Sequence, residues 1–233
     1  MGFFFGGKMP IIAGIDEAGR GPVIGPLVLA IAAIDSEKES ELREIGVKDS
    51  KQLSPNRRSI LFEDLNTRLL NYKFVIIPPS EIDDAVTADD TNLNYLEADK
   101  SIELIKSLTS ETKIDELFID CPSTNITSYR NYLKKGLEIK LTCLVAEHKA
   151  DITYPIVSAA SIIAKVIRDR EIQSIQEMCQ VEFGSGYTSD TRTIEFLRNW
   201  LKEHRKFPNF VRLSWMTAKV MINDLNQTKL DNF

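Results

Sequence analysis

The chain has 233 residues, of which 29 are Lys or Arg, 34 are Asp or Glu, and 43% are hydrophobic. This apolar fraction is enough for a packed core, so the composition excludes global disorder, and the longest apolar run is too short for a membrane span, which takes roughly 20 residues. The net charge of −5 argues against a protein that merely coats nucleic acid.

Apolar patterning predicts that strands and helices alternate over the first three-quarters of the chain and that the last quarter is helical. The strands are expected at residues 11–15, 23–34, 74–77, 117–119 and 139–145. One helix is expected to begin at Ser54-Pro55. Further helices are expected near residues 93–108, 126–136, 157–178, 193–204 and 214–225. This order predicts an α/β fold with a small helical C-terminal subdomain.

Acidic residues stand where three of the predicted strands end. Asp16 and Glu17 close the first strand, Asp120 closes the fourth, and Asp151 lies between the fifth strand and the long helix. Strand ends on one side of an α/β sheet are where such folds build active sites. Clustered carboxylates repel one another unless cations join them, and oxygen ligands favour Mg²⁺ or Mn²⁺. The pattern therefore predicts a divalent-metal site, against the alternative of exposed acids at turns.

The glycines that follow the first acids partly match a dinucleotide-binding fingerprint, from Gly19 to Gly25. That fingerprint has to open a helix. Here Pro22 and a run of Val, Ile and Leu follow, which favours a strand, so we reject a nucleotide cofactor.

One segment departs from the acidic character of the chain. Residues 192–219 contain seven basic and two acidic residues. A solvated helix face and a phosphate-facing surface both explain this charge, and the sequence leaves the two interpretations open.

The segment Gly14 to Pro26, Gly-Ile-Asp-Glu-Ala-Gly-Arg-Gly-Pro-Val-Ile-Gly-Pro, resembles the signature of the ribonuclease HII family. Further blocks agree in order, and together they extend the resemblance from about Ile11 to about Val220. They are Asp49 to Leu53, Glu147 to Asp151, Tyr154 to Lys165, and Gly184 to Tyr187. The last block and Phe207 to Arg212 are more similar to the archaeal and eukaryotic branch, and the compact chain favours a single-subunit archaeal enzyme.

The resemblance implies a ribonuclease H-like mixed sheet flanked by helices. It also implies an endonuclease that cleaves the RNA strand of RNA–DNA hybrids and incises DNA duplexes at embedded ribonucleotides, through two metal ions, leaving 5′-phosphate and 3′-hydroxyl ends. The family's four catalytic and metal-binding acids correspond to Asp16, Glu17, Asp120 and Asp151. Its ribonucleotide-sensing loop corresponds to Gly19-Arg20-Gly21 and its sensing tyrosine to Tyr187.

Elementary chemistry agrees with these roles. The 2′-hydroxyl distinguishes RNA from DNA, and glycines let backbone groups approach it closely. Arg20 offers a planar fork to a phosphate, and the ring of Tyr187 can stack on a sugar or base. Lys51 and Lys165 are further candidate phosphate contacts. We leave His148 without a role, because two metal ions can lower the pKa of water themselves.

Two rival functions stay open at this stage. One is a two-metal nuclease of the same fold that acts on DNA structures, which would have no need of a ribonucleotide-sensing loop. The other is a non-enzymatic RNA–DNA binding module, which would gain nothing from four acids beside a phosphate.

The chain is expected to divide into an N-terminal extension (1–10), a catalytic domain (11–183), a helical subdomain (184–226) and a tail (227–233). The tail contains Gln227, Leu230 and Phe233, whose spacing resembles the box by which replication and repair enzymes bind the sliding clamp. A frayed polar terminus is the alternative. The three cysteines form no CxxC pair, so we expect no structural zinc site and no disulfides, and a reducing cytoplasm. We also expect a monomer and, because the longest apolar run is short, no membrane partner.

Overall fold

The structure is a computed structural model that describes residues 9–47, 53–137 and 141–230. Five strands form one sheet: β1 (Ile11–Ala18), β2 (Leu27–Asp35), β3 (Asn71–Ile77), β4 (Glu116–Asp120) and β5 (Cys143–Glu147). Their order across the sheet is β3-β2-β1-β4-β5. The β1–β2 and β2–β3 pairs are antiparallel, whereas the β1–β4 and β4–β5 pairs are parallel, so the sheet is mixed as predicted.

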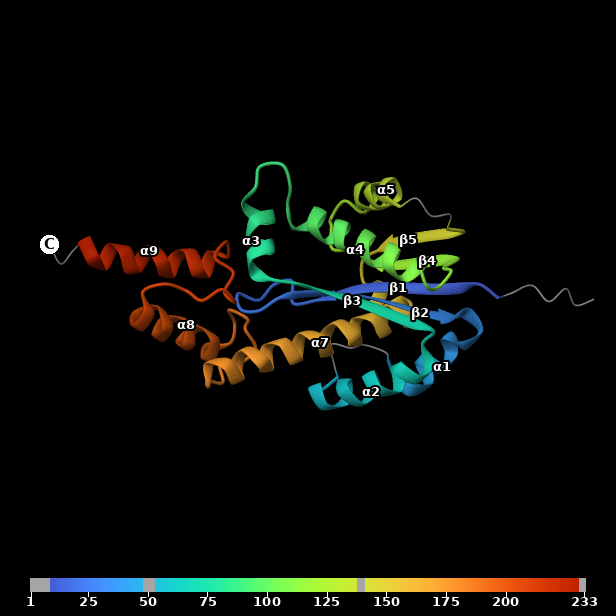
Figure 1. The fold of residues 1–233 in the computed structure, drawn as a ribbon, viewed down its shortest axis with the longest axis horizontal. Helices are drawn as coiled ribbons and strands as arrows, with labels where there is room; N and C mark the ends of the chain where they lie inside the picture. The colour runs from blue at the N-terminus through green and yellow to red at the C-terminus, as the bar shows by residue number, and fades with distance from the viewer. Residues whose placement is uncertain (1–8, 48–52, 138–140, 231–233) are drawn as a thin grey trace, which may run out of the picture.

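Helices cover both faces of the sheet, and two more extend it at one end (Figure 1). One face carries α3 (Pro79–Thr87), α4 (Leu93–Thr109) and α5 (Ile126–Gly136), and the other carries α1 (Glu39–Ile45), α2 (Pro55–Arg68) and α7 (Pro155–Cys179). The end is formed by α8 (Thr191–His204) and α9 (Met216–Leu230). The short elements are η1 (Ser36–Lys38) and α6 (Ala150–Thr153).

A third apolar cluster joins the helical end to the connection between β1 and β2. Val23 and Ile24 of that connection are fully buried with Phe183 and Leu197. Ile24 also forms an isolated antiparallel bridge with Val211. The α8–α9 region is therefore packed directly against the segment that follows Asp16 and Glu17.

The structure corrects several predicted boundaries. The strand expected at 23–34 begins only at Leu27, because Gly25 adopts a positive φ of 89° and Pro26 follows it. Directly after the strand predicted at 74–77, Pro79 begins α3, since proline is favoured in the first helical turn. The predictions missed this helix and α1.

The last two strands and the last helix also differ in extent. β5 begins at Cys143, and part of the strand predicted at 139–145 lies outside the described residues. The final helix begins at Met216 and continues through Leu230, so it includes the first residues of the predicted tail. The other predicted domain boundaries stay predictions.

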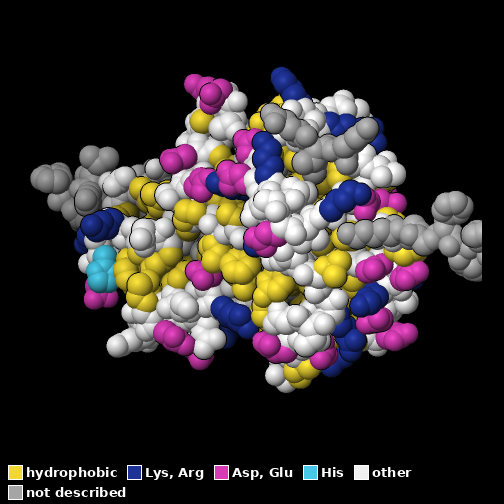
Figure 2. Space-filling model, turned by 45° about the vertical axis from the view of Figure 1, so that its right-hand side comes forward, with side chains coloured by type: hydrophobic (Ala, Val, Ile, Leu, Met, Phe, Trp, Pro, Cys, Tyr) yellow, Lys and Arg dark blue, Asp and Glu magenta, His cyan; other side chains and the backbone are white. Residues whose placement is uncertain are grey.

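The glycine-rich segment joins two antiparallel strands, which confirms the rejection of a dinucleotide fingerprint. Within the described ranges, none of the helices is both long and apolar enough to cross a bilayer. On the face shown in Figure 2, basic and acidic side chains are interspersed, so this face presents no broad basic surface.

Candidate active site

Three of the four predicted acids meet at the end of the parallel part of the sheet. The β1–β4 pairing ends at Ile15 and Ile119, and Asp16 and Asp120 are the next residues of the two strands. Asp151 comes from α6, and carboxylate oxygens of the three aspartates lie within 4.8 Å of one another. The sequence predicted that the first strand ends at Asp16 and Glu17. In the structure β1 continues beside β2 to Ala18.

Burial makes this cluster electrostatically costly without a cation. Asp16 and Asp151 are 4% and 2% exposed. Desolvation raises the pKa of Asp16 to about 6, and repulsion from Asp120 adds to the effect, while the nearby Lys165 ammonium and a hydrogen bond with Ser161 oppose it. Oxygen ligands held this close together suit a hard divalent cation.

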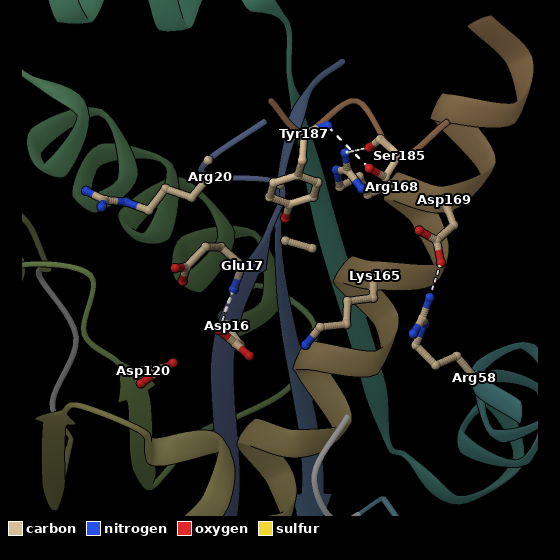
Figure 3. Close-up of a pocket in the computed structure, with 13 residues that line it drawn as sticks. Asp16, Glu17, Arg20, Arg58, Asp120, Lys165, Arg168, Asp169, Ser185 and Tyr187 are labelled. Carbon is tan, nitrogen blue, oxygen red and sulfur yellow. Dashed lines mark hydrogen bonds and ion pairs between the residues drawn. The ribbon is translucent and has the colours of Figure 1, made fainter. Parts of the chain in front are cut away.

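Glu17 lies beside this triad without belonging to it. Its backbone N–H donates to Asp16 Oδ1 at 2.7 Å, which fixes the Asp16 carboxylate (Figure 3). Burial, and then the charges of Asp16 and Glu97, hold the pKa of the Glu17 carboxyl well above its ordinary value. Glu97, which was not among the predicted site residues, is a fifth acid in this region, only 1% exposed.

Lys165 approaches the acids from α7. Its ammonium donates to Ser161 Oγ at 2.5 Å, one helical turn earlier, and Figure 3 shows it extending toward Asp16. The ammonium of Lys165, a predicted phosphate contact, therefore lies close to the carboxylate of Asp16. Lys51, the other predicted phosphate contact, lies outside the described residues.

The Gly19-Arg20-Gly21 segment lines the same cavity as the acids. Gly19 has a φ of 87°, and a Cβ there would lie 2.6 Å from the Arg168 side chain and 2.7 Å from the Pro26 carbonyl oxygen, so only glycine fits. A Cβ on Gly21 would meet only the Tyr187 ring, at 3.6 Å. Arg20 itself turns away from the cavity centre toward α4 (Figure 3).

Tyr187 lines the same cavity beside Gly21 and is 39% exposed. Its ring lies 5.3 Å from the guanidinium of Arg168, which is almost fully buried and donates to the carbonyl of Ser185 at 3.0 Å. Arg168 thus supports both Tyr187 and Gly19. Arg168 was not among the predicted site residues, although a charged residue on the apolar face of the long helix indicates a buried role.

Together these groups enclose a cavity of about 490 Å³ that is open to solvent. An ion pair between Arg58 and Asp169, at 2.6 Å, lies on its α2–α7 side. Predicted site residues that line the cavity are Asp16, Glu17, Gly19, Arg20, Gly21, Asp120, Lys165 and Tyr187. His148 Nδ1 lies 3.0 Å from the Cys121 carbonyl oxygen.

Comparisons with known proteins agree with this geometry. The family model described as Ribonuclease HII matches residues 13–218. The chain is 45% identical to Ribonuclease HII of Pyrococcus horikoshii over 224 residues, which cover 95% of this chain and 98% of the relative. The crystal structure of ribonuclease H2 from Pyrococcus horikoshii OT3 superposes with a TM-score of 0.84 at 44% identity, covering 93% of this chain and 99% of that chain. A PCNA:RNase HII complex from Archaeoglobus fulgidus gives a TM-score of 0.79 at 40% identity, covering 95% and 100%.

Proposed function

The chain belongs to the ribonuclease HII family, and from this premise we propose that Asp16, Asp120 and Asp151 hold its catalytic metal ions. Its activity is that of the family: metal-dependent endonucleolytic cleavage of the RNA strand in RNA–DNA hybrids, and incision at ribonucleotides embedded in DNA. The two-metal mechanism, with 5′-phosphate and 3′-hydroxyl products, is general for the family. Membership of the ribonuclease HII family argues against a non-enzymatic binding module and against a nuclease restricted to DNA.

The observation that supports the metal site is the buried triad itself. Its carboxylates lie within 4.8 Å of one another, and burial together with repulsion from Asp120 raises the pKa of Asp16 although the Lys165 ammonium is nearby. We propose Mg²⁺ or Mn²⁺ as the cation, with Glu17 as a further ligand at the rim. Such ions supply activation of water and stabilisation of the leaving oxygen.

The chain's own groups account for substrate placement. We propose that Lys165, beside the acids, contacts a phosphate close to the scissile bond, and that Tyr187 stacks on a sugar or base. The Gly19-Arg20-Gly21 segment is proposed to read the 2′-hydroxyl through backbone groups. Its support is a pair of donors: the N–H groups of Arg20 and Gly21 have no acceptor among the residues described, and both residues line the cavity.

Arg20 fits a more restricted role than a free phosphate fork. Its Nε donates to both carboxylate oxygens of Glu97, and its Nη2 donates to Asn94 Oδ1. We propose that these bonds fix the loop and leave Nη1 for the substrate.

One further partner is proposed from the tail. A similar protein of Archaeoglobus fulgidus was solved as a PCNA:RNase HII complex. The box of Gln227, Leu230 and Phe233 is proposed to bind such a clamp here. Monomeric state and the cytosolic compartment also stay predictions.

The test is cleavage of a DNA duplex that carries one ribonucleotide. We expect a cut at that ribonucleotide with Mg²⁺ or Mn²⁺, no cut in excess chelator, and recovery when the ion is restored. The all-DNA duplex of the same sequence is the control. Cleavage that persists in chelator would contradict the metal site, and equal cleavage of the all-DNA duplex would contradict the ribonucleotide-reading loop.

A further inference from the structure

A buried arginine from the C-terminal region binds the backbone of the glycine loop. Arg212 is 0% exposed, and its guanidinium donates three hydrogen bonds to carbonyl oxygens between β1 and β2. Nη2 donates to Gly19 O at 2.5 Å, Nη1 to Arg20 O at 2.9 Å, and Nε to Gly25 O at 3.0 Å. All three guanidinium nitrogens are therefore used on one segment of backbone.

A second side chain completes this contact. Trp215 Nε1 donates to Gly21 O at 2.9 Å, and the Trp215 ring lies 4.9 Å from the Arg212 guanidinium. Arg212 and Trp215, which we call the carbonyl anchor, thus engage every carbonyl of Gly19-Arg20-Gly21.

The anchor is itself held rigidly in place. The Arg212 N–H donates to Val23 O at 2.9 Å, next to the bridge between Ile24 and Val211. On its other side, the N–H groups of Leu213 and Ser214 donate to the Asp83 carboxylate of α3 at 2.7 and 2.9 Å. These bonds hold the main chain on both sides of Arg212, to the β1–β2 connection and to α3, so the side chain starts from a fixed backbone position.

Peptide geometry links the anchor to the substrate side of the loop. In a trans peptide, the C=O and the next N–H point in opposite directions. Fixing Gly19 O therefore fixes the direction of the Arg20 N–H, and fixing Arg20 O fixes that of the Gly21 N–H. These are the two donors without an acceptor among the described residues, in the segment that lines the cavity.

We infer that Arg212, assisted by Trp215, is a positioning residue that aims the Arg20 and Gly21 amides at the ribonucleotide. The inference rests on the proposed reading role of the loop and adds the element that orients it. Arg212 touches no reacting atom; it acts by holding two peptide planes, which a mobile glycine segment would otherwise let rotate. Its loss should weaken the preference for a ribonucleotide while leaving metal binding intact.

The experiment measures preference rather than activity alone. KM is determined for a duplex with one ribonucleotide, and the inhibition constant is determined for the all-DNA duplex of the same sequence. The preference ratio, which is the inhibition constant divided by KM, is compared in the parent, Arg212→Lys and Trp215→Phe. Mn²⁺ affinity and melting temperature are measured alongside. Trp200→Phe, in the same helical region but away from the loop, is the matched control.

Arg212→Lys keeps the charge, but one ammonium lacks the planar fork that meets three carbonyls. We expect it to lower the preference ratio about tenfold and Trp215→Phe to lower it about threefold, from the usual strength of one or two hydrogen bonds. Mn²⁺ affinity and the all-DNA inhibition constant should stay within about twofold of the parent.

The outcomes distinguish a failure of the carbonyl-anchor hypothesis from a failure of the proposed reading role of the loop. A parent ratio near one contradicts the reading role of the loop. A clear parent preference that both variants retain, or a fall in kcat with an unchanged ratio, overturns the anchor. If Arg212→Lys fails to fold, the ratio of Trp215→Phe decides alone, because that variant keeps the ring beneath the guanidinium.

Discussion

Arg20 binds a buried carboxylate through its Nε, so only part of its guanidinium is left for a phosphate. Its Nε lies 2.9 and 3.2 Å from the two oxygens of Glu97, which is 1% exposed, although Arg20 itself is 39% exposed. Desolvation raises the pKa of Glu97 to about 7, and the charge of Arg20 opposes this rise. The pair ties the glycine loop to α4 and keeps a charge beside Glu17.

Replacing Glu97 with Gln should lower kcat/KM on a one-ribonucleotide duplex about tenfold, since a hydrogen bond to a charged group contributes about 1.5–3 kcal/mol. The free energy of unfolding should change by less than about 1 kcal/mol, because solvent can hydrate the half-exposed Arg20. Glu103→Gln is the control, since Glu103 forms an exposed pair with Lys100 on the same helix. Equal losses in both variants would contradict a specific role for Glu97.

The sequence predicted the acids but not the groups that orient the loop. Asp16 and Asp120 each follow an apolar run, and parallel pairing of β1 with β4 brings the ends of these runs together. Asp151 follows the fifth strand at a short distance and joins them from α6. Glu97 was harder to find, because a single acid in a helix is usually solvated. Its signal was its position four residues before the buried Ser101, on the inner face of α4.

Arg212 could not have been assigned at all. Its carbonyl partners lie 187 to 193 residues away in the chain, and backbone acceptors leave no trace in residue identity. In the sequence, Arg212 is one of the seven basic residues of segment 192–219. In the structure it is completely buried. Long-range contacts to the main chain are thus what sequence patterns miss here.

Asp16→Asn should abolish cleavage while substrate binding stays near that of the parent. The change removes a proposed metal ligand and also relieves repulsion of the phosphate. We expect a loss of roughly 100-fold or more, because even an outer-shell partner of a metal site typically costs 10–100-fold. Cleavage and duplex affinity, measured separately at saturating Mg²⁺, test this. Full metal-dependent cutting by the variant would refute the site.

The same variant should change how stability depends on pH. The folded-state pKa of Asp16, about 6, exceeds its ordinary value of 3.8, so ionisation disfavours the folded protein as pH rises from about 4 to about 6. Asn cannot ionise. In chelator, Asp16→Asn should therefore be more stable than the parent at pH 8 by up to about 3 kcal/mol, and the difference should vanish below about pH 4. Denaturant melts at both pH values decide this.

Tyr187→Ala should impair cutting at a single ribonucleotide while Mn²⁺ affinity survives. The exposed ring faces the cavity above Arg168, and loss of base–aromatic stacking costs about 1–3 kcal/mol, or roughly 5- to 150-fold. Tyr187→Phe retains the ring and should keep most of the activity. If Ala and Phe behave alike, the hydroxyl rather than stacking carries the role.

Three cations of the helical end line a groove with Leu201, Met221 and Leu225, and they provide a test of duplex binding. Arg198, Lys202 and Arg205 lie on or just after α8, on the side that faces α9. Changing all three to Gln should weaken duplex affinity and flatten its salt dependence by roughly one log–log unit per lost phosphate contact. A triple change of Lys106, Lys134 and Lys135 controls for net charge. An unchanged slope would favour the solvated-face interpretation.

The last prediction concerns the tail as a clamp-binding box. Helix α9 includes both Gln227 and Leu230, so these two residues, three apart, share one face of the helix backbone. Gln227 is exposed, whereas Phe233 lies outside the described residues. A helical turn that presents a polar anchor and two apolar side chains is the form in which such peptides enter a groove.

Substitution tests this better than truncation at Asn226, because truncation would also remove the last turn of α9. Leu230→Ala with Phe233→Ala should weaken binding to PCNA at least roughly tenfold, since burial of each large apolar side chain contributes about 1.5–3 kcal/mol. Lys229→Ala, between them in sequence, is the control and should bind like the parent. Cleavage of a free one-ribonucleotide duplex should be unaffected by all three substitutions, because the proposed catalytic and substrate-reading residues do not include these positions. If the double variant binds PCNA as the parent does, or if the parent shows no binding at micromolar concentration, the tail is not a clamp box and the frayed-terminus interpretation holds.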